Sequence, residues 1–197
     1  MYKRQEEIAR ISLDNPENAV PYIVREVFSS LIDITKKDTA NLAAPTEEQV
    51  QARKKLISNF IVMENAKQGQ GQVKLPYQLT EKDFALANEL SPMEQAERNK
   101  EYALYTISIL AKIYTDEVEK QTGNIVPLTD LPGSAAIVDA LRFNPNSGVK
   151  IAAIDALRHI QRPEYKEELT TLYTLAQADS NPQVSMAAER ALNRSNV

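Results

Sequence analysis

Few residues in this chain have the types and spacing that catalysis or metal binding requires. The chain has a single histidine, His159, and no cysteine. A zinc or di-iron site needs several ligands at helical spacing, and the residue three positions before His159 is Ala156 rather than a glutamate. We therefore interpret His159 as a helix-surface histidine. We expect no metal site, no bound cofactor and no cysteine nucleophile.

Two further patterns could carry catalysis. Glu94, Glu97 and Glu101 fall on one face of a predicted helix, and paired carboxylates can perform acid–base chemistry. Charges near the start of a helix are also favoured by its dipole, so we interpret them as solvated helix charges. Gly133-Ser134 lacks the G-x-S-x-G frame of a serine nucleophile and is interpreted as a turn and helix cap. We assign no catalytic residue.

The charge balance limits the class of partner. The net charge is −4, and the basic clusters Lys36-Lys37 and Arg53-Lys54-Lys55 have acidic residues close by. A phosphate backbone is bound by a basic excess, which this chain lacks, so we expect no nucleic-acid partner and interpret both clusters as solvated surface. The sequence contains no run of about 18 apolar residues, so no membrane span is expected.

Helices must position these residues, because apolar side chains recur with helical period along most of the chain. Ile8 and Ile11 mark a short first helix, which ends before Pro16. Two capping boxes, Thr46 with Gln49 and Ser91 with Glu94, predict helix starts. The further predicted helices cover about residues 20–35, 46–66, 80–90 and 91–120.

The same pattern divides the chain into four parts. We predict an N-terminal helical segment (1–67), a linker rich in glycine and glutamine (68–79), central helices (80–123) and a repeat region (124–197). Residues 102–114 are apolar on nearly every side, which predicts a central helix buried all round.

The repeat region contains two related helices. Val149, Ala152, Ala153, Ala156 and Leu157 recur as Val, Ala, Ala, Ala and Leu at a constant offset of 35 residues. Each copy follows an Asn-Pro pair, at 144–145 and at 181–182, and each is preceded by another amphipathic helix. Self-similarity at this period predicts stacked helical hairpins whose alanines allow close helix approach.

One comparison orients the predicted stack. Ile154 lies on the side of its helix away from the Ala/Leu positions, and its equivalent 35 residues later is Glu189. A terminal repeat needs a polar outer side. We therefore expect Ile154 to be covered by the last repeat and Glu189 to face water.

The pattern resembles HEAT repeats of the phycobilisome-lyase-like type over roughly residues 132–195. Asn144 and Asn181 stand near the usual aspartate, and Lys150 and Ser185 replace the usual arginine. The resemblance implies an all-α fold in which HEAT-like helical hairpins form a right-handed α-solenoid, an α-α superhelix.

Three functions remain open. The first is a non-catalytic scaffold or adaptor that binds another protein. Its candidate surface is one strip of the repeat region, formed by Asp155, Arg158, His159, Arg190, Asn193 and Arg194. The second, implied by the lyase relatives, is a lyase- or chaperone-like domain with a bound chromophore or small ligand in a pocket lined by Tyr102, Tyr105 and Tyr114. The third is a structural domain of a longer protein.

The first five residues resemble the translation of a transposon-end sequencing adapter. On this interpretation they are excluded from the fold, and the native chain begins upstream of Glu6. Localisation then stays open between the cytoplasm and export.

Overall fold

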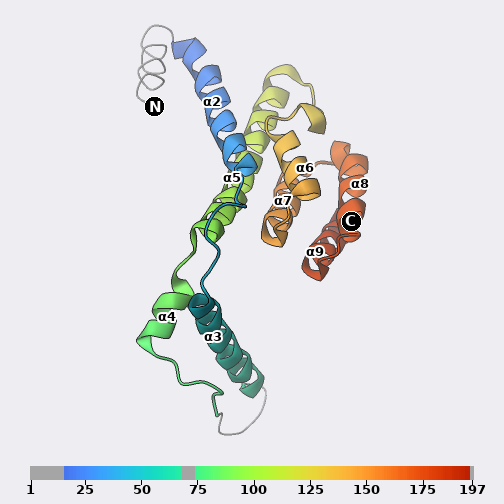
Figure 1. Ribbon diagram of the computed structural model, residues 1–197. Helices are drawn as coiled ribbons and strands as arrows, with labels where there is room; N and C mark the ends of the chain where they lie inside the picture. The colour runs from blue at the N-terminus through green and yellow to red at the C-terminus, as the bar shows by residue number, and fades with distance from the viewer. Residues whose placement is uncertain (1–15, 68–73, 196–197) are drawn as a thin grey trace. The chain divides into compact units, whose positions relative to one another are not determined.

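The computed structural model describes residues 16–67 and 74–195, and this part of the chain is all-α, as predicted (Figure 1). The predicted helix at Ile8 and Ile11 lies outside the described residues. Two 3₁₀ turns, η1 (Leu128–Asp130) and η2 (Pro163–Tyr165), accompany the helices. The helices are α2 (Pro16–Lys36), α3 (Glu47–Ala66), α4 (Glu81–Asn88), α5 (Pro92–Thr122), α6 (Ser134–Phe143), α7 (Ser147–His159), α8 (Lys166–Gln177) and α9 (Pro182–Ser195). Among them, none combines the length and apolar character needed to cross a membrane.

Local capping explains where the helices begin. At the start of α3, Thr46 N–H donates to Gln49 Oε1 (2.8 Å) and Gln49 N–H donates to Thr46 Oγ1 (3.2 Å), which confirms the first capping box. Ser91 and Glu94 form the second box in the same way, at 3.0 and 3.2 Å. A third capping box at the start of α4 was not predicted from the sequence. In it, Thr80 and Asp83 each accept a hydrogen bond from the other's backbone N–H.

The chain forms two units. Among the described residues, the large unit combines 16–37 with 97–195, and the small unit comprises 38–67 and 74–96. The small unit therefore interrupts the large one in sequence. It contains both α3 and α4, although the sequence analysis placed these helices on opposite sides of a linker. The reason is that α3 and α4 pack against each other through contacts between residues far apart in sequence.

Polar contacts hold the small unit together. Lys55 Nζ lies 2.7 Å from Asp83 Oδ1, and Asn59 forms a reciprocal pair of hydrogen bonds with the backbone of Tyr77, at 2.9 and 3.1 Å. Arg53 donates to the carbonyls of Ala87 and Glu89 and pairs with the Glu94 carboxylate. The hydrogen bond from Lys55 is the main reason that the pKa of Asp83 falls from 3.8 to about 2.

This pKa predicts an acid-dependent stability for the small unit. Because the folded-state pKa of Asp83 is depressed, its contribution is complete above 3.8 and is lost as the pH falls towards about 2. We expect Asp83→Asn to be less stable than wild type at neutral pH, and the difference to close over that interval. NMR signals of α3, followed in both proteins from neutral pH into acid, measure this. A difference independent of pH would contradict it.

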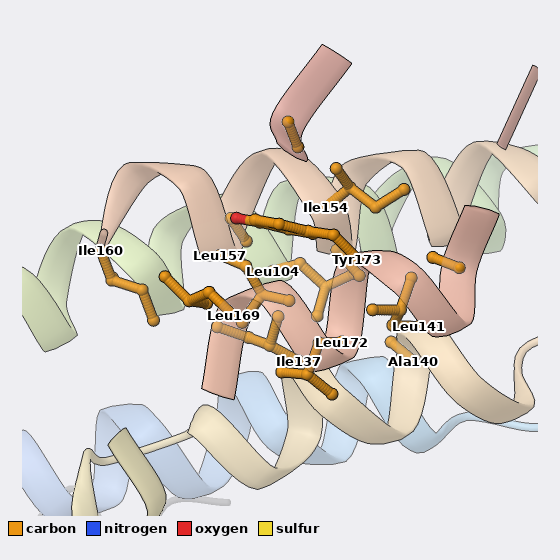
Figure 2. Packing of buried hydrophobic residues seen from close by; sticks show 14 of the residues in the cluster. Leu104, Ile137, Ala140, Leu141, Ile154, Leu157, Ile160, Leu169, Leu172 and Tyr173 are labelled. Carbon is orange, nitrogen blue, oxygen red and sulfur yellow. The ribbon is translucent and has the colours of Figure 1, made fainter. Parts of the chain in front are cut away.

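In the large unit, the two C-terminal hairpins stack on each other. Helix α6 packs against α7 and α8 against α9, while α7 also contacts α9 and α6 contacts both α8 and α2. Figure 2 shows Leu157, Ile154 and Tyr173 meeting in the buried interior, with Leu104 of α5 close by. All four side chains are fully buried, so the hairpins share one apolar core.

The repeat positions behave largely as predicted. Val149, Ala153 and Leu157 are fully buried, and so are the equivalents Val184 and Ala188. Ile154 is buried and Glu189 is exposed, both as predicted. Ala152 and Ala187 are only half-buried, so the second alanine of each Ala-Ala pair occupies the tightest position.

The prediction that the middle of α5 is buried all round was wrong. Leu104, Ile107 and Ala111 are fully buried, whereas Tyr102 and Ile113 are 60% and 59% exposed. The helix contributes one side to the core, and its apolar residues on the other side remain in water.

Candidate functional site

The six residues of the predicted strip lie at equivalent positions on two packed helices. Asp155, Arg158 and His159 on α7 correspond, at the offset of 35, to the residues of α9. Those α9 residues, Arg190, Asn193 and Arg194, are all exposed. Asp155 is exposed as well, while Arg158 and His159 are half-buried. The structure therefore places the strip at the surface, on neighbouring helices.

The strip is not uniformly charged. Arg158 Nη1 lies 2.7 Å from Asp155 Oδ1, so these two charges offset each other within α7. Exposed pairs of this kind contribute little to stability. The basic character of the strip therefore comes from Arg190 and Arg194 on α9.

An aromatic side chain from a third helix joins the strip. The ring of Tyr105, on α5, lies 5.9 Å from the His159 ring, centroid to centroid, at an interplanar angle of 42°. Tyr105 is 55% exposed and Tyr102, one helical turn away, is 60% exposed. This contribution was not predicted, because both tyrosines lie in a segment that was expected to be buried or to line a pocket.

The tyrosines named in the second hypothesis lie at the surface of α5. Tyr102, Tyr105 and Tyr114, which were predicted to line a pocket, are each at least 40% exposed.

Ion pairs link α7 and the turn after it to α5 and to the loop before α9. Arg162, in the turn after α7, donates to Glu119 Oε2 (2.6 Å) and also pairs with Asp116, both on α5. These carboxylates raise the pKa of Arg162. Lys150 on α7 lies 2.6 Å from Asp179 in the loop before α9, and this contact lowers the pKa of Asp179. These contacts connect α7 to its neighbours on both sides.

The loops before α7 and α9 repeat the same hydrogen bonds. Asn146 N–H donates to Asn144 Oδ1 (2.9 Å), and Asn181 N–H donates to Asp179 Oδ1 (2.8 Å). The side-chain oxygens of Asn146 and Asn181 then accept from the backbone N–H of the second residue of their helices, Gly148 and Gln183. The equivalent pairs are thus 144 with 179 and 146 with 181, which corrects the predicted alignment of the two Asn-Pro pairs. Asp179, which this alignment pairs with Asn144, is the residue that Lys150 contacts.

The glutamates of α5 and the basic cluster on α3 are less solvated than predicted. Glu97 is 7% exposed and pairs with Lys100 at 3.1 Å, and Arg53 is engaged by Glu94. Glu101 lies beside the start of α7, where a Cβ on Gly148 would come within 2.5 Å of its carboxylate, and burial raises its pKa. Within residues 16–67 and 74–195, no three His, Cys, Asp or Glu side chains are grouped to hold a metal ion.

A groove between α6 and α8 was not predicted from the sequence. The groove has a volume of about 470 Å³ and lies in the large unit. Its lining includes the apolar side chains of Val138 and Leu172 and the charged side chains of Asp139, Arg142 and Glu168.

Comparison of the chain with models of protein families, with curated proteins and with solved structures gives no significant match.

Proposed function

We propose that the large unit is a short α-solenoid of HEAT-like hairpins that binds another protein. The observation that carries the proposal is the repetition, at an offset of 35, of the same loop hydrogen bonds before two helices that pack side by side. Stacked units of this kind present an extended surface for a partner.

Helices α2 and α5 are proposed to form the first hairpin of this solenoid. They run in opposite directions in Figure 1, and α2 contacts α6 as α6 contacts α8. Helix α5 meets α7 through the Tyr105–His159 ring contact and through the ion pairs of Arg162. The small unit is then an insertion between the two helices of this first hairpin.

The proposed binding surface is formed by the second helices of the three hairpins. It contains Tyr105 of α5, Arg158 and His159 of α7, and Arg190 and Arg194 of α9. Tyrosine and arginine are the residue types that most often dominate interface energies, together with tryptophan. Because Arg190 and Arg194 give this surface its basic character, we propose a protein partner that presents carboxylates.

Charge reversal at Arg190 tests the proposal. We expect Arg190→Glu to weaken partner binding roughly tenfold or more, because a repulsive charge replaces an attractive one. Its melting temperature should stay at the wild-type value, since Arg190 is exposed. The partner is first identified by affinity purification of the tagged full chain from its native cell extract, and its affinity is then measured with purified components.

Lys166→Glu is the matched control, because Lys166 is an exposed base on α8, outside the proposed surface. Binding that responds equally to both substitutions would show only a general charge effect. Binding that responds to neither would place the partner elsewhere and remove the proposal.

A further inference from the structure

The small unit turns its larger apolar side chains outward. Among its described residues, the buried apolar side chains are the alanines Ala52 and Ala96. The face of α3 that meets α4 is instead polar or small, with Gln49, Ala52 and Asn59 buried. Contacts of this kind align two helices but leave their apolar residues without cover.

Helix α3 carries the clearest of these uncovered surfaces. Ile57, Phe60 and Ile61 are 58%, 61% and 52% exposed, although they belong to a single helix of 20 residues. By helical geometry they lie on a side of α3 away from the buried Asn59. Exposed apolar patches of this kind commonly mark interaction sites.

The spacing along this side of α3 is that of a coiled coil. Val50, Lys54, Ile57, Ile61 and Glu64 follow one another at alternating intervals of four and three residues, which are the a and d positions of a heptad repeat. Phe60 flanks this seam. Isoleucines occupy its centre, and a lysine and a glutamate occupy the positions on either side.

We propose that α3 pairs with α3 of a second copy of this chain, in antiparallel orientation. Ile57 and Ile61 lie two residues on either side of Asn59, and Lys54 and Glu64 lie five residues on either side. A two-fold axis at the level of Asn59 therefore places Ile57 against Ile61 of the second copy. The same axis places Lys54 against Glu64 of the second copy, and Glu64 against Lys54.

Charge complementarity selects this orientation. A parallel pair in register would set lysine against lysine and glutamate against glutamate, which is unfavourable. In the antiparallel pair, each Lys54 faces a Glu64 instead. One such opposite-charge layer lies at each end of the isoleucine layers. The interaction is self-complementary, as a two-fold interface requires. It involves the small unit alone and is independent of the function proposed for the large unit.

The expected association is weak, because the seam is short. Twenty residues span about 30 Å, and three of the five seam positions are apolar. We therefore expect a dimer with a dissociation constant of roughly 1–100 µM, which sedimentation velocity of the full chain resolves when run from about 1 to about 500 µM.

Charge reversal tests both the association and its register. We expect Lys54→Glu and Glu64→Lys each to weaken dimerisation at least tenfold, and the double variant to recover the wild-type value, because it restores both opposite-charge layers. Circular dichroism checks that every variant keeps its helix content. Lys166→Glu, in the large unit, should dimerise like wild type. A chain that stays monomeric at the highest concentration, or a double variant as weak as the single ones, would overturn the proposal.

Cross-linking gives a readout that does not depend on the affinity change. The chain contains no cysteine, so Lys54→Cys and Glu64→Cys each introduce a unique thiol. A short thiol cross-linker should join the two variants when they are mixed and should leave either one alone largely unlinked. Efficient linking of Lys54→Cys to itself would indicate parallel pairing, and no linking in the mixture would indicate that α3 has another occupant. Both results would overturn the proposal.

Discussion

Replacing Leu157 by alanine is expected to lower the free energy of unfolding by about 2–5 kcal/mol, because the substitution leaves a cavity that the surrounding core can fill only in part. Leu157 is fully buried, and Figure 2 shows it within the cluster shared by α7, α8 and α5. Its neighbours there are Leu104 of α5 and both Leu169 and Tyr173 of α8. Because they belong to two other helices, they cannot all shift towards the vacated space.

Leu175→Ala is the control for this prediction. Leu175 is the same residue type on the neighbouring helix α8, but it is 51% exposed. Its replacement should cost well under about 1 kcal/mol, as surface substitutions usually do. Urea denaturation of the three proteins, with thermal melts as a second measurement, gives the comparison. If Leu157→Ala were no less stable than Leu175→Ala, the shared core of the stacked hairpins would be wrong.

Signals between near neighbours in sequence were predicted well. The capping boxes at Thr46 and Ser91 depend on residues three positions apart, so they were visible before any tertiary structure. The burial of Ile154 and the exposure of Glu189 were also predicted, since the offset of 35 makes them equivalent positions in the two copies of the sequence pattern.

Features that depend on distant contacts were missed. Arg53 belongs to a basic cluster in sequence, yet its guanidinium is engaged by Glu94, which lies 41 residues away. Tyr105 stands among apolar residues, so periodicity could not tell which side of α5 the core covers. Both cases are decided by packing between helices, for which a single sequence carries no local signal.

The division into units was hidden for a related reason. The large unit resumes at Glu97 after an interruption of 59 residues, and the chain order alone suggests consecutive segments. The proposed first hairpin, α2 with α5, lacks the alanines that identify the later repeats. An insertion between its two helices also removes the regular period by which such repeats are recognised.

Replacing Gly133 by alanine is expected to lower the free energy of unfolding by about 2–4 kcal/mol, because two independent costs add. Gly133 precedes α6 with φ of 78°, a left-handed conformation that is unfavourable for alanine. In addition, a Cβ at this position would collide with Ile107 Cγ2 of α5 and would lie 3.4 Å from Phe28 Cδ1 of α2. The residue therefore lets three helices approach closely.

Gly123→Ala separates the two costs. Gly123 has nearly the same φ, 70°, but a Cβ there would meet no atom within 4 Å. Its substitution should show only the backbone cost, about 1–2 kcal/mol. Equilibrium urea unfolding of both variants measures the difference, which we attribute to the contact with Ile107 and Phe28. Equal losses would mean that α2, α5 and α6 are not tightly packed there, and the proposed continuity between the first hairpin and the later repeats would lose its main physical support.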